Sequence, residues 1–543
     1  MALTLTSEQT WRLDLYKVSQ IENVTPNLSL GRGGTTASSW RRAQWFNLAV
    51  LFFTATFTVS NLVSDSGLLP LAAFYLLTAS TLISFWGLSA VPFINPIQSF
   101  VLVQYVWFGV APAVLSGYAL LRGQVVELAV LQDDVILISI VVAPGLVLYS
   151  VASRLTIRQL RSWISVPARR LLAPPSGYEP KFLLLLCLVV GIAHFCPFLL
   201  GTIGIVGVRE VNYLGGTQTD IWWVGLIVAV GSIQPLIVSS LVSAWVFNGR
   251  RTPLLIQVLL ITFVLLTLWS SLVGGWKSPL LILCSYYVLA FISRFQRFPW
   301  ALVLIATVGL VGFIGPFINQ ARFVANQSEI KDSSERQKMF LEVLLNPSEF
   351  LSTSLDSVDS FIALPFRGIM PLAAEVTRRN GAWSGEWGGS TFAWGLEALV
   401  PRVFHPAKSE MNIGNYFFRT LRAENDENTF HSVAISLPFE VVGNFGIVVG
   451  VLSFGAIGVV WAAICVGILT ANRLATHPLS PYMSIGVVAM EGAFGHYLAG
   501  LREFAIGLAV MAIVSLLSGR NRVSRIGRDP ARITLKTRLI GEI

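Results

Sequence analysis

The chain has 543 residues, of which 54% are hydrophobic and only 12% are charged. Soluble domains carry about 25% charged residues, so this composition excludes an ordinary soluble protein and indicates an all-α polytopic membrane protein. The net charge is +9. The basic residues lie where membrane topology requires them, so we expect no nucleic-acid partner. All four cysteines lie in apolar runs and are expected to be small buried hydrophobes without a disulfide framework or a metal site: Cys187, Cys196, Cys284 and Cys465.

Runs of roughly 20 apolar residues are long enough to cross the hydrocarbon core of a bilayer as helices. The sequence predicts about twelve such spans. They lie at 44–63, 68–88, 98–120, 135–152, 182–206, 221–247, 253–271, 279–293, 298–319, 443–469, 479–499 and 503–518.

The basic residues predict the orientation of these spans. With both termini in the cytoplasm, the inner segments hold 23 Lys and Arg, whereas the short outer loops hold four. Cytoplasmic loops of membrane proteins carry the excess of Lys and Arg, so the opposite orientation is rejected. The basic C-terminal tail is then cytoplasmic and can also contact anionic membrane lipids.

The longest polar stretch, between spans nine and ten, faces outward in this topology. It carries 11 basic and 14 acidic residues, and several of its segments have the apolar spacing of helices. One of them, "GGSTFAWGLEALVPRVFHP", is expected to form an amphipathic helix from Ser390 or Thr391 to Pro401, with Phe392, Trp394 and Leu396 at the bilayer interface. The predicted organisation is a cytoplasmic tail (1–43), spans one to nine (44–319), a folded, mostly helical outer loop (320–437), spans ten to twelve (438–518) and a basic tail (519–543).

Arginines gather on the outer side of the predicted bundle. Arginine binds phosphate through a planar fork of donors and stays charged, so these residues are candidates for a diphosphate site at headgroup level. The alternative for each is an ion pair with the loop's own acids or a contact with lipid headgroups. Arg209 and Arg322 are the strongest candidates by position, with further ones at Arg367, Arg378, Arg379, Arg402, Arg419 and Arg422.

The segment "ENTFHSVAISLPFEVVGNFG" places His431 and Glu440 just before span ten. A histidine can act as a general base or stabilise an oxyanion near neutral pH, or it can be a structural residue of the loop. Glu440 could orient a sugar hydroxyl or cap the start of span ten, and Gly443 with Gly446 would let another helix or a lipid approach closely.

A second ionisable pair, Glu491 and His496, lies inside span eleven. Ionisable residues within a span usually face the protein interior, so the pair is either functional or a polar lock between helices. The sequence contains no nucleotide-binding, zinc-protease or serine-hydrolase motif, and we expect no cofactor and no metal.

Two stretches carry a family resemblance. "HSVAISLPFEVVGNFGIVVGVL" resembles the signature at the end of the large outer loop of the O-antigen ligase and Wzy-type oligosaccharide repeat-unit polymerase superfamily. "LEALVPRVFHPAKSEMNIGNYF" resembles the polymerase branch, and the predicted topology agrees with a GT-C-like layout.

The resemblance implies a glycosyltransferase of surface polysaccharide biosynthesis, of the O-antigen or exopolysaccharide polymerase type. Such an enzyme joins undecaprenyl-diphosphate-linked oligosaccharides at the periplasmic face, without nucleotide or metal, and works beside chain-length regulators and flippases. By this resemblance His431 and Glu440 would be catalytic, and Arg209, Arg322, Arg367 and Arg402 would hold diphosphate. Trp383, Trp387 and Trp394 would pack against sugars or anchor the loop at the interface.

Three other functions compete with polymerisation. A ligase would move a finished glycan onto another acceptor. A transferase for sugars on lipid monophosphates is disfavoured, because its first outer loop would be sizeable and acidic, whereas here it reads "VSDSG". A lipid-linked glycan flippase or transporter is disfavoured because no internal repeat is visible.

Overall fold

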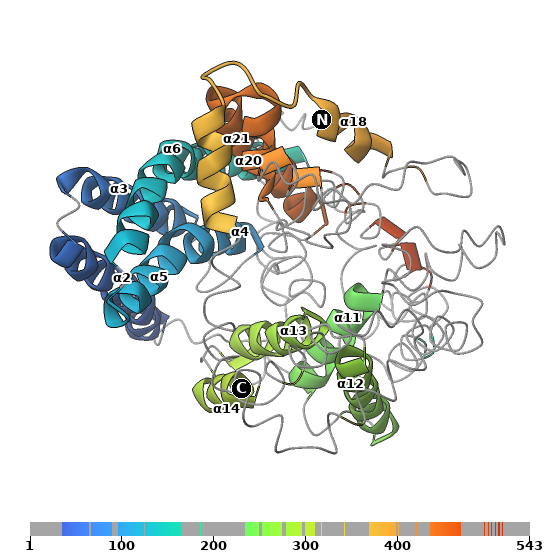
Figure 1. Ribbon diagram of the computed structural model, residues 1–543. Coiled ribbons are helices and arrows are strands. Elements are labelled where there is room, and N and C mark those ends of the chain that lie inside the picture. Colours follow the sequence, from blue (N-terminus) through green and yellow to red (C-terminus); the bar gives the residue numbers. More distant parts are fainter. Residues whose placement is uncertain are drawn as a thin grey trace, which may run out of the picture. The chain divides into compact units, whose positions relative to one another are not determined.

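The computed structural model describes residues 35–64, 67–88, 96–123, 125–163, 234–248, 254–273, 278–295, 299–309, 369–397 and 435–468, with a few short pieces elsewhere. These residues are helical, and no β-strand occurs among them (Figure 1). The chain divides into two compact units, Met1–Leu51 and Phe52–Ile543. The first contributes the beginning of helix α2, and the contacts described below lie in the second.

The labelled helices occur in the following chain order. They are α2 (Thr35–Ser64), α3 (Leu68–Gly87), α4 (Pro96–Tyr105), the π-helix η1 (Val106–Val110), α5 (Ala111–Leu121), α6 (Val125–Trp163), α11 (Gln234–Asn248), α12 (Leu254–Val273), α13 (Ser278–Phe295), α14 (Trp300–Gly309), α18 (Ser390–Glu397), α20 (Leu437–Phe445) and α21 (Ile447–Ile468). A further helix covers 369–379.

Five helical segments among the described residues are long and apolar enough to cross a membrane. They are Phe46–Ser64, Leu68–Trp86, Ile97–Leu121, Leu131–Leu160 and Ile447–Cys465. Each lies on a span expected from the sequence, which confirms a helical protein with several membrane-spanning segments. The fourth is longer than predicted, because α6 continues through Arg154 and Arg158 to Trp163 instead of ending at 152.

The third span contains a local irregularity. The α-helical ladder of α4 changes to the five residues of η1 before α5 continues in the same direction. Pro112 lies in the first turn of α5 and has no N–H to donate to that ladder, which accounts for the interruption. Gly109 is needed here, because a Cβ at this position would overlap the ring of Tyr105.

Helix α6 is the centre of one helical group, since it packs against both α3 and α21. Glycines allow α21 to lie close to it: Gly145 faces the ring of Phe454, and Gly455 faces Leu148. The Ser153 hydroxyl donates a hydrogen bond to the Gly458 carbonyl (3.2 Å). Small residues at helix contacts are typical of membrane bundles, where close van der Waals packing replaces the hydrophobic effect.

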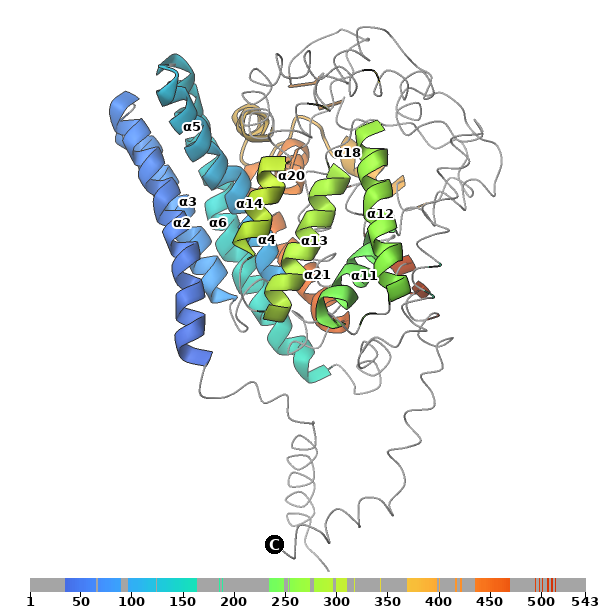
Figure 2. The same ribbon diagram turned by 90° about the horizontal axis from the view of Figure 1, so that it is seen from below.

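Contacts between α6 and α21 pair residue 145 with 454 and residue 153 with 458. The residue numbers thus increase together along both helices. The two helices therefore run in the same direction. The predicted topology requires this, because spans four and ten are both even-numbered. Helices α11, α12 and α13 contact one another, with α13 beside both α11 and α12 (Figure 2).

Replacing Gly458 by valine is expected to disrupt the packing of α21 on α6. A Cβ at this position would lie 2.7 Å from the backbone oxygen of Tyr149, which cannot move without bending α6. We expect a loss of several kcal/mol and a lower unfolding midpoint in detergent. The control is Gly309→Ala, where no heavy atom from the described part of the chain lies within 4 Å of the added Cβ. Equal midpoints for both variants would contradict the packing described here.

Candidate functional site

Of the catalytic and diphosphate residues that the family resemblance implies, Glu440 is the one that the structure describes. The others lie outside the described residues: His431, Arg209, Arg322, Arg367 and Arg402, as well as the pair Glu491 and His496. The site is therefore built from Glu440 and the described segments around it.

Glu440 lies on a short helix of its own rather than at the start of span ten. Helix α20 begins after Ser436, whose backbone is extended, with Pro438 in its first turn, and it ends at Gly446. Gly446 has a φ of +93°, a conformation that favours glycine, and it separates α20 from α21. The span predicted at 443–469 thus starts at Ile447.

The Glu440 side chain is fully buried and joins three segments of the chain. The Phe494 N–H donates a hydrogen bond to its Oε2. The Asn444 side-chain amide donates to the Glu440 carbonyl (2.7 Å) and to the Thr391 hydroxyl oxygen of α18 (2.7 Å). Segments more than 50 residues apart in sequence therefore meet at one carboxyl group.

Burial raises the pKa of Glu440 to about 7, against the opposing effects of the Thr391 hydroxyl and the Phe494 N–H. Oε1 has no hydrogen bond of ordinary geometry among the described residues, although the Thr391 hydroxyl is near enough to the carboxyl to lower its pKa. A buried carboxyl that exchanges its proton near neutral pH is a common feature of functional sites.

The close approach expected at Gly443 and Gly446 is made by the chain itself. The Trp387 indole lies against Gly443, and the backbone N–H of Trp387 donates to the Gly443 carbonyl (2.8 Å). The first two amides of α21 donate to the carbonyls of Gly381 (3.0 Å) and Ala382 (2.9 Å). Because these amides are already bonded, the N-terminus of α21 is not an open anion site.

The three tryptophans of this loop segment lie in different environments. Trp383 is 71% exposed and remains a candidate for interfacial anchoring or sugar contact. Trp387 is buried and stacks on Phe417 with a ring separation of 4.9 Å, so it packs the interior of the loop instead. Trp394 makes an edge contact with Tyr416 at 4.9 Å.

The predicted amphipathic helix is present as α18, but it is shorter and partly internal. It begins at Ser390 as expected and ends at Glu397. Phe392, expected at the bilayer interface, stacks on Phe494 at 4.2 Å and contacts Phe445 at 5.2 Å. Leu396 is 56% exposed, which agrees with the predicted apolar outer face.

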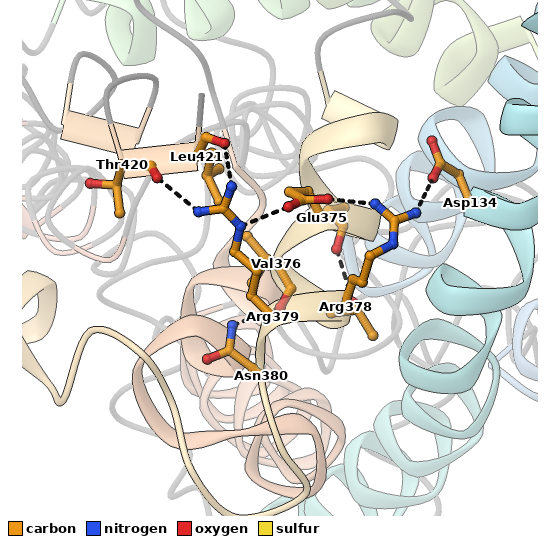
Figure 3. A network of polar contacts seen from close by, with 10 residues as sticks. Asp134, Glu375, Val376, Arg378, Arg379, Asn380, Thr420 and Leu421 are labelled. Carbon is orange, nitrogen blue, oxygen red and sulfur yellow. Dashed lines mark hydrogen bonds and ion pairs between the residues drawn. The ribbon is translucent and has the colours of Figure 1, made fainter. Parts of the chain in front are cut away.

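A second polar cluster surrounds Arg378 and Arg379 on the helix at 369–379 (Figure 3). Arg378 donates to Glu375 (2.5 Å) and to Asp134 of α6 (3.3 Å). Arg379 also donates to Glu375 (2.7 Å) and reaches the carbonyls of Thr420 (2.9 Å) and Leu421 (2.6 Å).

This cluster contains two arginines and two carboxylates, so its formal charges cancel. The hydrogen bond from Arg379, together with that from Arg378, lowers the pKa of Glu375 and keeps it ionised. For Arg378 and Arg379 the structure thus agrees with the alternative that outer-face arginines pair with the protein's own acids. Neither supplies the unpaired positive charge that a diphosphate site needs.

Several residues of these clusters, among them Asn444, Asp134 and Glu375, were not singled out from the sequence. Asn444 lies four residues after Glu440, and this spacing on a helix could have indicated that they share a face. Asp133 and Asp134 directly precede the apolar part of a span, where such acids could have suggested a partner. Among the described residues, no group of His, Cys, Asp or Glu side chains is arranged to hold a metal ion.

Comparison with protein-family models, curated proteins and solved structures found no match in any of the three. The interpretation of the site depends on its residues alone.

Replacing Glu440 by glutamine is expected to make folding stability less dependent on pH. The folded-state pKa of about 7 lies above the usual 4.5, so the native protein binds the proton more tightly than the unfolded chain. Wild-type stability then falls as the pH rises from about 4.5 to about 7, by about 3 kcal/mol in total. Glutamine can still accept the Phe494 N–H but does not ionise.

The measurement is the unfolding midpoint of both proteins between pH 5 and pH 8. We expect the variant to gain stability relative to the wild type as the pH rises. A difference between the two proteins that stays constant across this range would show that Glu440 does not titrate as described.

Proposed function

We propose that this protein is a polymerase of a surface polysaccharide. It would transfer a growing glycan from one undecaprenyl diphosphate to the terminal hydroxyl of a fresh lipid-linked repeat unit. In this proposal the chain has about twelve spans in a bacterial inner membrane, both termini are cytoplasmic, and the large loop lies on the periplasmic side.

The observation that carries the proposal is the buried carboxyl of Glu440 in the segment that resembles the polymerase and ligase signature. Within that segment, α20 turns at Gly446 into the membrane helix α21, and it brings Glu440 against Thr391 of the loop and against Phe494. An ionisable group where a loop and a membrane helix meet suits a reaction at the lipid headgroup level.

The chemistry needs no nucleotide, because the leaving group is already activated. The acceptor hydroxyl oxygen forms a bond to the anomeric carbon of the donor glycan, while the bond from that carbon to the lipid diphosphate breaks. His431 would accept the proton of the attacking hydroxyl. Arg209, Arg322, Arg367 and Arg402 would neutralise the departing diphosphate.

Glu440 would act on this site indirectly, as a positioning residue. Because its side chain is fully buried, its role is to position α20. The bonds of its carboxyl and of Asn444 tie the end of the signature segment to the loop and to residue 494.

A ligase that transfers finished glycan to a different acceptor is the second candidate, because its loop signature resembles that of a polymerase. The stretch 396–417 favours the polymerase. It contains the pattern of Pro-Arg, an aromatic residue, Pro and Lys that is similar to that branch.

The test is an elongation assay with purified protein in liposomes that contain lipid-linked repeat units, without nucleotide. A ladder of longer lipid-linked chains is the expected product. Movement of the substrate across the bilayer without new bonds would indicate a flippase. Transfer to an added acceptor without elongation would indicate a ligase.

A further inference from the structure

The guanidinium group of Arg379 holds a distant piece of the outer loop. Its Nε donates to Glu375 (2.7 Å), its Nη1 to the Thr420 carbonyl (2.9 Å) and its Nη2 to the Leu421 carbonyl (2.6 Å) (Figure 3). All three nitrogens are used, and the planar fork of arginine is the side chain that can serve three such acceptors at once.

The same network is anchored to the membrane-spanning part of the protein. The second oxygen of Glu375 accepts a hydrogen bond from Arg378 (2.5 Å). Arg378 also donates a hydrogen bond to Asp134 of α6 (3.3 Å). Asp134 is buried and lies near the beginning of the span Leu131–Leu160. A continuous series of charged contacts therefore connects one end of this span to the backbone at residues 420–421.

The connection at residues 420–421 bears on function because these residues lie close to His431 in the sequence. Leu421 lies ten residues before His431. The end of the same polar segment is held by Glu440 and Asn444 through α18 and residue 494. The described attachments at residues 420–421 and at residues 440–444 thus lie before and after His431 in the sequence.

We propose that Arg379 is a positioning residue, which holds the chain at residues 420–421 so that His431 is correctly placed for glycosyl transfer. Asp134, Arg378 and Glu375 anchor Arg379 to helix α6. The link to catalysis depends on the function proposed above, whereas the attachment of residues 420–421 does not.

The test compares Arg379→Lys with the wild type. Lysine keeps the charge and can still pair with Glu375, but its single ammonium group cannot bind Glu375 and both carbonyls in the same plane. The matched control is Arg122→Lys. Arg122 is another arginine of a predicted outer loop, and it lies over the ring of Tyr118 at 5.5 Å.

Two readouts separate the parts of the proposal. Amide hydrogen exchange of peptides that cover residues 416–421 is expected to become faster in Arg379→Lys and to stay unchanged in Arg122→Lys. In the elongation assay we expect kcat to fall by about tenfold or more, with KM unchanged within about twofold, because misplacing a catalytic group slows the reaction without weakening binding.

Unchanged exchange at residues 416–421 would overturn the attachment. Faster exchange with an unchanged kcat would overturn the positioning role, and a rise in KM with kcat unchanged would indicate that Arg379 binds substrate instead. If the wild type forms no polymer, the proposed function fails, while hydrogen exchange still decides the attachment. If Arg379→Lys does not accumulate, Glu375→Gln tests the same connection with a smaller expected effect.

Discussion

Replacing His431 by alanine is expected to abolish polymer formation while the protein still accumulates in the membrane. General base catalysis typically contributes a factor of about 10² to 10⁴ to the rate, so loss of the base leaves no visible ladder. Arg322→Ala is expected to have the same result through loss of diphosphate stabilisation. Polymer length and membrane abundance are measured together in cells that depend on this protein.

The control for this experiment is His477→Ala, which removes a histidine from the predicted cytoplasmic loop after span ten. It is expected to leave the polymer unchanged. Full-length polymer in both His431→Ala and Arg322→Ala would remove the assigned site residues, whereas the helical membrane fold would stand.

Replacing Gly446 by alanine is expected to prevent stable folding of the junction between α20 and α21. Gly446 has a φ of +93°, and an added Cβ would lie 2.7 Å from the Ser384 nitrogen and 2.8 Å from the carbonyl oxygens of Gly381 and Ala382. These are backbone atoms that cannot rotate away, so steric overlap adds to the conformational cost. We expect a loss above about 4 kcal/mol, which is exceptional for a single substitution.

The matched control is Gly388→Ala, since Gly388 also has a positive φ (+57°) but no heavy atom of the described residues within 4 Å of an added Cβ. This variant is expected to cost only about 1 to 2 kcal/mol. The measurement is the unfolding midpoint of each variant in detergent. Similar losses in both variants would mean that steric overlap with residues 381–384 is not what makes Gly446 necessary.

The sequence predicted those features that depend on local composition. The apolar runs of spans one to four and ten coincide with five long apolar helices, because the length and hydropathy of a span are readable from the sequence. Ser390 was correctly expected to begin a helix. The break at Gly446 was missed, because a glycine in an apolar run does not by itself show whether it bends the chain or packs a helix.

Long-range pairing could not be read from one sequence. Arg379 was grouped with the candidate phosphate ligands, and only the fold shows that it binds Glu375 and the carbonyls of residues 420 and 421. Glu440 was singled out as a candidate site residue from its place in the sequence. Its burial and its contact with Phe494, 54 residues away, depend on tertiary packing.

The central claim is that this protein breaks the bond between a glycan and its lipid diphosphate each time it forms a glycosidic bond. The most direct test incubates the purified protein with lipid-linked repeat units alone and counts both products by mass spectrometry. We expect one undecaprenyl diphosphate to be released for each repeat unit added to a chain, in the absence of nucleotide. Repeat units that remain single, with no lipid diphosphate released, would contradict the proposed glycosyl transfer.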